Sequence, residues 1–292
     1  MGCECVDPDS EVPNGATSIT STDLSMIVKS YANMMLRGGK AIPLFVYGSP
    51  GIGKTDIINA VGHELKLPVY TFIASTMEAS DVRGIPFPNT VNKTTEWLPP
   101  SEFKRQNKPA IYFFDELNTA DMSVRTAFYQ LILSGKLGDI DISNSLRIGA
   151  GNNKGFVPEI KNLWLGTPLA TRFDVYWMIP DYYGWLDWAK THKINPIILE
   201  FLEANHMGSQ SKKGSNFFYC VSPSVACQGI NMATPRGWAK VSDLISYGLD
   251  APVNFQSAVG VIPGKAFYTF YRNTLENRKT NIQERESTFE IE

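Results

Sequence analysis

The chain has 292 residues, of which 43% are hydrophobic and 19% charged, enough for one or two globular domains with a full core. Its net charge of -2 gives no overall attraction to nucleic acid, and no apolar run approaches the ~18 residues that a membrane span needs. The four cysteines and the lack of an apolar secretory segment predict reduced thiols in the cytoplasm.

The first part of the chain changes character near residue 21. Residues 1–20 are polar and have no periodic apolar face, so the sequence predicts a flexible tail. From Thr22 to Met35 apolar residues recur at helical spacing, and Gly38-Gly39 ends this predicted helix before the first strand.

The next stretch, Gly-Ser-Pro-Gly-Ile-Gly-Lys-Thr, fits the phosphate-binding P-loop pattern. Its glycines let backbone N–H groups wrap phosphates, Lys54 supplies positive charge to them, and the Thr55 hydroxyl can hold Mg²⁺. An apolar strand over Ala41–Tyr47 precedes the loop and an amphipathic helix over Lys54–Leu65 follows it, which is the order the motif requires. The predicted nucleotide-binding residues are Gly48, Ser49, Pro50, Gly51, Ile52, Gly53, Lys54 and Thr55.

A second strand is predicted over Pro68–Ala74, and the polar stretch Ser75–Arg83 follows at its carboxyl end. In open α/β sheets that end carries function. The segment Gly84–Pro100 contains four prolines and favours an ordered insertion with a hairpin rather than a core element.

A third predicted strand, Ala110–Phe114, runs directly into two acids, Asp115 and Glu116. A buried strand that delivers carboxylates at its carboxyl end is what a P-loop site needs from a neighbouring strand. Asp115 would hold Mg²⁺ through water, and Glu116 would orient or deprotonate the attacking water. The predicted metal-binding residues are therefore Thr55 and Asp115.

Three later polar residues each have an ordinary interpretation beside a functional one. Asn152 follows the strand Leu146–Ala150, where it either bonds a γ-phosphate and the attacking water or is a turn residue. Arg172 precedes a β-rich run, a place where arginine is usually a surface charge. Arg236 lies in the first turn of a predicted helix, where it opposes the helix dipole, which suggests that it is held for another purpose.

In this order of elements the chain resembles the AAA+ ATPases and, within them, the MoxR-like group. The matching motifs are Gly48–Thr55, Ser80–Pro86, Phe113–Asn118, Gly149–Asn152, Leu169–Phe173 and Thr234–Trp238. The resemblance implies an α/β P-loop NTPase fold with a five-stranded parallel sheet in the order 5-1-4-3-2, helices on both faces, and a small helical lid. It implies ATP as substrate with Mg²⁺ as cofactor, and the catalytic roles of sensor 1 for Asn152, arginine finger for Arg172 and sensor 2 for Arg236, beside Glu116.

The implied organisation is a tail over residues 1–20, an α/β core over 21–180, a helical lid over 181–275 and a charged tail over 276–292. The resemblance also implies a ring, usually a hexamer, in which the arginine finger completes the neighbouring subunit's site. Its client or adaptor would be a protein with a von Willebrand factor A domain.

Two segments need separate mention. Many relatives have proline after the sensor 1 asparagine, whereas this chain has Asn153, which leaves the loop geometry open. Ser80–Pro86 resembles a family insertion that faces the ring pore, where Arg83 either touches substrate or packs internally.

Other functions stay open on the sequence alone. A nucleotide-gated binding module would use the same P-loop with little turnover, and the full set of Asp115, Glu116, Asn152 and Arg172 argues against it. The near-neutral charge counts against a motor or loader on nucleic acid. A kinase or GTPase is disfavoured because no phosphoacceptor-binding element and no Asn-Lys-x-Asp motif is present.

Overall fold

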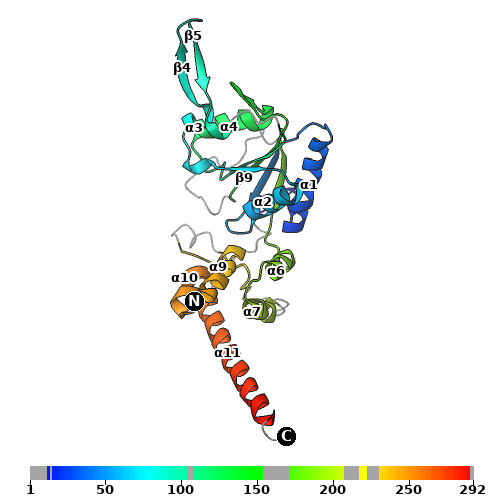
Figure 1. Cartoon of the computed structure of the whole chain (residues 1–292), viewed down its shortest axis with the longest axis vertical. Coiled ribbons are helices and arrows are strands. Elements are labelled where there is room, and N and C mark those ends of the chain that lie inside the picture. The colour runs from blue at the N-terminus through cyan, green and yellow to red at the C-terminus, as the bar shows by residue number, and fades with distance from the viewer. Residues whose placement is uncertain are drawn as a thin grey trace. The chain divides into compact units, whose positions relative to one another are not determined.

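The computed structural model describes residues 12–13, 15–103, 108–153, 171–206, 217–221 and 230–289. They form two compact units, an N-terminal unit that ends at Ile179 and a C-terminal unit that starts at Pro180. Figure 1 shows the elements of both units.

A parallel sheet forms the centre of the N-terminal unit. Its strands are β1 (Ser18–Ile19), β2 (Leu44–Gly48), β3 (Val69–Ile73), β6 (Ile111–Asp115), β9 (Leu146–Gly151) and β10 (Asp174–Met178). They lie in the order β1-β10-β2-β9-β6-β3, and every neighbouring pair is parallel. Without β1, this is the predicted order 5-1-4-3-2, so the expected fold class is confirmed.

The sixth strand, β1, lies in a segment that was expected to be part of the flexible tail. Ser18 pairs with Trp177 and Ile19 with Met178 at the edge of the sheet. Ile19 is only 5% exposed. A strand of two residues is too short to show an alternating pattern, so no local signal indicates that the sheet extends to this segment.

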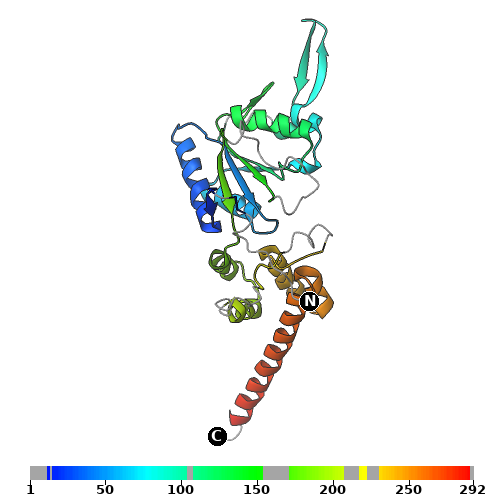
Figure 2. The ribbon, with the colours of Figure 1, turned by 180° about the vertical axis from the view of Figure 1, so that it is seen from behind.

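Helices cover both faces of the sheet (Figure 1, Figure 2). Helix α1 (Ser21–Leu36) packs beside α2 (Lys54–Leu65), and the short helix α3 (Ala79–Arg83) packs beside α4 (Met122–Ser134). Two 3₁₀ turns, η2 (Ala74–Thr76) and η3 (Ser101–Phe103), complete the helical segments of this unit. Burial on both faces explains why the central strands are apolar without alternation.

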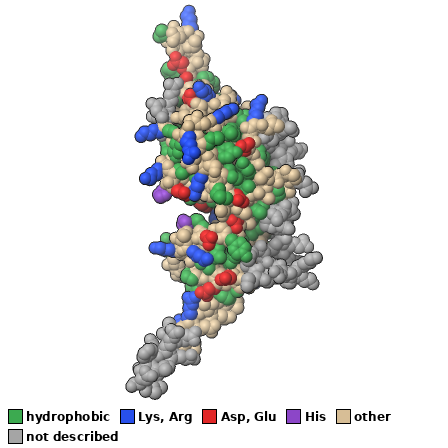
Figure 3. Space-filling view, turned by 90° about the vertical axis from the view of Figure 1, so that its right-hand side faces the viewer, with side chains coloured by type: hydrophobic (Ala, Val, Ile, Leu, Met, Phe, Trp, Pro, Cys, Tyr) green, Lys and Arg blue, Asp and Glu red, His purple; other side chains and the backbone are tan. Residues whose placement is uncertain are grey.

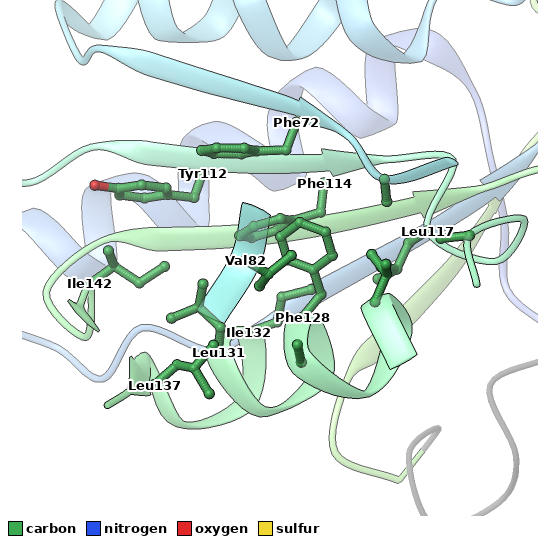
Figure 4. Packing of buried hydrophobic residues seen from close by; sticks show 14 of the residues in the cluster. Phe72, Val82, Tyr112, Phe114, Leu117, Phe128, Leu131, Ile132, Leu137 and Ile142 are labelled. Atoms are coloured by element: carbon green, nitrogen blue, oxygen red, sulfur yellow. The ribbon is translucent and has the colours of Figure 1, made fainter. Parts of the chain in front are cut away.

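Aromatic side chains fill the layer between the sheet and helices α3 and α4 (Figure 4). The ring of Phe114 on β6 lies 5.5 Å from that of Phe72 on β3 and 4.9 Å from that of Phe128 on α4. Val82 on α3 is fully buried in the same layer. This packing fixes the carboxyl ends of β3 and β6, which lead into the site described below.

A buried arginine holds the opposite end of β9. Arg147 is 4% exposed, and its guanidinium donates to five carbonyl oxygens, those of Ala41, Ile132, Ile142, Ser143 and Ser145. Burial lowers its pKa to about 10, so the side chain remains charged at neutral pH. One side chain thereby ties the end of α4 and the start of β9 to the segment before β2.

Two hairpins extend the N-terminal unit, and the longer one lies in Gly84–Pro100, where the sequence predicts a hairpin. Strands β7 (Lys136–Leu137) and β8 (Ile140–Asp141) form a short one. Strands β4 (Ile85–Asn89) and β5 (Thr94–Leu98) form a longer one that projects from the unit (Figure 1). The longer hairpin exposes large apolar side chains, which are Ile85, Phe87, Val91, Trp97 and Leu98.

The C-terminal unit is helical. Its helices are α6 (Tyr182–Thr191), α7 (Pro196–His206), α9 (Pro235–Ser246), α10 (Pro252–Val259) and α11 (Val261–Phe289). Trp238 on α9 is fully buried, packs on Phe201 and Phe267, and donates its indole N–H to the Phe217 carbonyl at 2.9 Å. The Thr234 hydroxyl caps α9, because it accepts the Gly237 N–H at the start of the helix.

Gly260, whose φ is +91°, separates α10 from α11, and α11 contains Pro263 because proline is tolerated in the first turn of a helix. Helix α11 also continues through residues 276–289, where a charged tail was expected. The guanidinium of Arg278 contacts the Glu200 carboxylate on α7 at 2.7 Å, which holds the helix beyond residue 276.

The expectation of reduced thiols is also wrong for Cys220, which is disulfide-bonded. Cys220 is 5% exposed, and the other three cysteines lie outside the described residues. Cysteine counting cannot reveal a disulfide, since pairing depends on which two cysteines the fold brings together. Across the described parts of the chain, none of the helices combines the length and apolar character needed to cross a membrane.

Candidate functional site

The strand register brings the P-loop, Asp115, Glu116 and Asn152 to one edge of the sheet, whereas Arg172 precedes β10 and lies at the opposite edge. Gly48 at the end of β2 is opposite Met178, and Tyr47 is opposite Gly151 at the end of β9. Asp115 at the end of β6 is opposite Ile73 on β3. Because these strands are parallel, the segments that follow them all emerge at this edge, where α/β sheets bind ligands.

The P-loop connects β2 to α2 at this edge. Gly53 is the residue before α2 and has φ +99°, a backbone conformation that residues with a side chain rarely adopt. The helix begins at Lys54, so its first N–H groups and the positive end of its dipole face the loop. The Lys54 ammonium donates to the Gly48 carbonyl at 2.7 Å and to the Ser49 carbonyl at 3.0 Å. The loop thus gathers N–H donors and a buried cation, the donor set that phosphate requires.

A contact between two elements joins the loop to β6. The Thr55 hydroxyl donates to Asp115 Oδ2 at 2.8 Å, although the residues are 60 positions apart. A hydroxyl and a carboxylate are hard oxygen ligands of the kind that Mg²⁺ prefers, so both predicted metal ligands fit the ion. The described residues contain no group of three or more His, Cys, Asp or Glu that could hold a metal ion. Mg²⁺ would therefore depend on phosphate oxygens and water for its remaining ligands.

Glu116 is held in a strained turn directly after Asp115. Its φ of +55° is uncommon for a residue with a side chain. Its backbone N–H donates to Asp115 Oδ1 at 2.9 Å, and its carboxylate accepts a short hydrogen bond from the Ser75 hydroxyl. Ser75 lies in the turn η2 directly after β3, the strand that pairs with β6, so this contact fixes the direction of the Glu116 side chain. The sequence indicated function for the stretch Ser75–Arg83 but did not identify Ser75.

A third side chain, Asn118, connects the turn after β6 to the loop after β9. Its amide nitrogen donates to the Asn152 carbonyl at 2.8 Å, and its amide oxygen accepts the Asn152 N–H at 3.0 Å. Asn118 is 1% exposed. The next residue, Asn153, is also buried, and its amide nitrogen donates to the Ser49 hydroxyl at 3.3 Å. Sequence reasoning noted Asn118 and Asn153 in their motifs but assigned them no contact.

The two predicted arginines occupy different units. Arg172 lies in the turn before β10 and is exposed. Arg236 lies in the first turn of α9, in the C-terminal unit, and is also exposed. Arg83 at the end of α3 is exposed too, so its side chain does not pack internally in this chain.

Comparison with known proteins gives one family match. Residues 43–143 match the model of the AAA domain (dynein-related subfamily). This segment carries the P-loop and the Asp115-Glu116 pair, whereas Asn152, Arg172 and Arg236 lie outside it. No curated protein matches the sequence.

Solved structures that match in a structural comparison include RuvB of Thermotoga maritima. The RuvB Holliday junction branch migration motor is 15% identical, with a TM-score of 0.47 over 86% of this chain and 68% of that chain. A point mutant of the same RuvB is 14% identical, with a TM-score of 0.43 over 89% of this chain and 64% of that chain. Both TM-scores lie below 0.5, and what these titles say applies to RuvB. Residues 43–143 are thus similar to the AAA domain of the dynein-related subfamily, and the chain has the α/β fold of AAA+ P-loop proteins.

Proposed function

We propose that the chain binds ATP with Mg²⁺ at this edge of the sheet and hydrolyses it as a ring-forming remodelling motor. The observation that carries the proposal is the 2.8 Å contact between Thr55 and Asp115. It brings together a P-loop hydroxyl and a strand-end carboxylate, and the sequence neighbours of this pair are Lys54 and Glu116. This combination serves phosphoryl transfer in P-loop proteins.

In this proposal each residue has a separate task. Backbone N–H groups of Gly51–Thr55 bind the phosphates, and Lys54 exchanges a carbonyl partner for a phosphate oxygen. Thr55 and Asp115 would hold Mg²⁺, which supplies positive charge for the phosphates, Asp115 through water. Glu116 orients the attacking water and accepts its proton.

Three more residues are assigned roles around the γ-phosphate. Asn152 would donate to a γ-phosphate oxygen and to the attacking water, as sensor 1. Arg172, as an arginine finger, would reach a neighbouring subunit's ATP, for which its exposure is suitable. Arg236 would act as sensor 2 from the helical lid.

The proposed assembly is a hexameric ring of the MoxR-like group, acting on a protein client or on an adaptor with a von Willebrand factor A domain. The long hairpin supports a protein partner over nucleic acid. It exposes Val91, Phe87 and Leu98 at 89%, 55% and 57%, and residues 85–98 carry two charged side chains, Lys93 and Glu96. Figure 3 shows apolar and charged side chains together on the projecting hairpin. Exposed apolar surface of this kind favours a protein contact, whereas phosphate backbones need cations.

The test of ring-dependent hydrolysis is phosphate release against protein concentration. We expect the rate per subunit of wild type to rise with concentration as particle mass increases. Arg172→Ala should assemble and bind ATP but lose about 10³-fold in turnover, the range observed for arginine fingers. Arg37→Ala, which removes an exposed arginine from the C-terminal end of α1, is the matched control and should behave as wild type.

A mixing experiment tests whether Arg172 acts across subunits. Lys54→Ala has a defective P-loop and an intact Arg172, whereas Arg172→Ala has the reverse. If Arg172 completes a neighbour's site, mixing the two inactive variants should restore part of the turnover. Turnover that is independent of concentration and of Arg172 would instead indicate a monomeric nucleotide switch.

A further inference from the structure

The loop after β9 is fixed by its contact with Asn118. Asn118 holds the Asn152 peptide groups on both sides, donating to the carbonyl at 2.8 Å and accepting from the N–H at 3.0 Å. Both hydrogen bonds are shielded, since Asn118 is 1% exposed. The backbone of Asn152 therefore has little freedom, and the directions of its own side chain and the next one are determined.

Gly151 makes this contact possible. A Cβ added at Gly151 would lie 2.6 Å from both Cγ and Oδ1 of Asn118. That separation is closer than side chains tolerate, so the Asn118 amide occupies the space that only glycine leaves open. Glycine at position 151 is thus required for the Asn118 side chain to lie against the loop.

Asn153 extends this connection to the P-loop. Its side chain is 5% exposed, and its Nδ2 donates to the Ser49 hydroxyl at 3.3 Å. Ser49 is 2% exposed, and its carbonyl accepts a hydrogen bond from the Lys54 ammonium at 3.0 Å. Hydrogen bonds and the peptide chain therefore connect Asn118, through Asn152 and Asn153, to Ser49, whose carbonyl accepts from Lys54.

We infer that Asn153 is a positioning residue that sets the P-loop for ATP by holding Ser49. The inference rests on the proposed function, since it needs ATP to bind in the loop. Asn153 acts through Ser49, and its role is separate from the one proposed for Asn152.

The test is a double-mutant cycle made of Asn153→Ala, Ser49→Ala and the double variant, in the full chain. The probe is a non-hydrolysable, fluorescent ATP analogue with Mg²⁺, and the readout is its Kd. Each single variant should raise the Kd about 3- to 10-fold, the size of one hydrogen bond. The Kd of the double variant should not exceed the higher of the two single-variant Kd values, because both changes remove the same contact.

Thermal unfolding without nucleotide separates positioning from structural support. If Asn153 only supports the fold, its variants would lower the unfolding midpoint and leave the Kd unchanged, which would overturn the inference. Additive effects of the two changes on the Kd would overturn it as well. Should Asn153→Ala not fold, Ser49→Ala removes the same contact from the other side. Asn33→Ala, an exposed asparagine on α1, is the matched control and should leave the Kd at the wild-type value.

The wild-type protein distinguishes this inference from the proposed function. If wild type binds the analogue and hydrolyses ATP while the Asn153 and Ser49 variants bind as well as wild type, only the inference fails. If wild type does not bind the analogue, both fail.

Discussion

Replacing Glu116 with glutamine is expected to slow ATP turnover by roughly 100-fold or more while ATP remains bound. The amide keeps the size of the carboxylate and can still accept the hydrogen bond from the Ser75 hydroxyl. It cannot take a proton from water at neutral pH, so the step that needs a base is lost. The binding residues Lys54, Thr55 and Asp115 are unchanged, and the Kd for ATP should be close to the wild-type value.

Single-turnover phosphate release and the Kd for ATP, measured on the same preparation, test this prediction. Glu96→Gln is the matched control. Glu96 is an exposed glutamate on the projecting hairpin, and its substitution makes the same chemical change away from the site. Turnover of Glu116→Gln near the wild-type rate would remove Glu116 from the mechanism. Loss of ATP binding together with turnover would indicate that Glu116 supports the site's structure.

Arg147→Met is expected to lower the free energy of unfolding of the N-terminal unit by about 3–5 kcal/mol. Methionine fills much of the same volume but donates no hydrogen bond. The five carbonyl oxygens that Arg147 now satisfies would be left without this donor. Removal of the buried charge offsets part of this cost, since burial already lowers the Arg147 pKa to about 10.

Urea unfolding followed by far-UV circular dichroism measures this loss, and hydrogen exchange of the β7–β8 amides locates it. Arg147→Lys keeps the charge but cannot reach all five carbonyls, so an intermediate loss is expected. Arg83→Met removes an exposed arginine and should change stability by less than about 0.5 kcal/mol. A change below about 1 kcal/mol for Arg147→Met would show that water or other donors satisfy these carbonyls.

The sequence was sufficient to predict the sheet and the main motifs. Strands β2 and β6 are continuous apolar runs that end in a glycine loop or in acids, and local patterns of this kind do not depend on distant residues. The long hairpin was visible for the same reason, since its prolines and the turn between its strands lie close in sequence. The sequence assigned Thr55 and Asp115 to one metal site, because the carboxyl ends of parallel strands meet at one edge, but it did not predict their direct contact.

What the sequence did not reveal depends on contacts between distant residues. The carboxylate of Glu116 is held by Ser75, which is 41 positions away and lies in the 3₁₀ turn that follows β3. Asn118 and Asn152 are 34 positions apart, and no periodicity marks either residue. Strand β1 is two residues long and exists only because β10 offers an edge to pair with. Such residues are identified only when the fold brings them together.

The measurement that tests the central claim most directly is phosphate release from ATP by the wild-type chain, with and without Mg²⁺, beside Lys54→Ala. We expect wild type to release phosphate only with Mg²⁺, and Lys54→Ala neither to bind ATP nor to release phosphate. Lys93→Ala, which removes an exposed lysine at the tip of the hairpin, should match wild type. Failure of wild type to bind ATP, or undiminished release by Lys54→Ala, would contradict the assignment of this edge of the sheet as an ATP site.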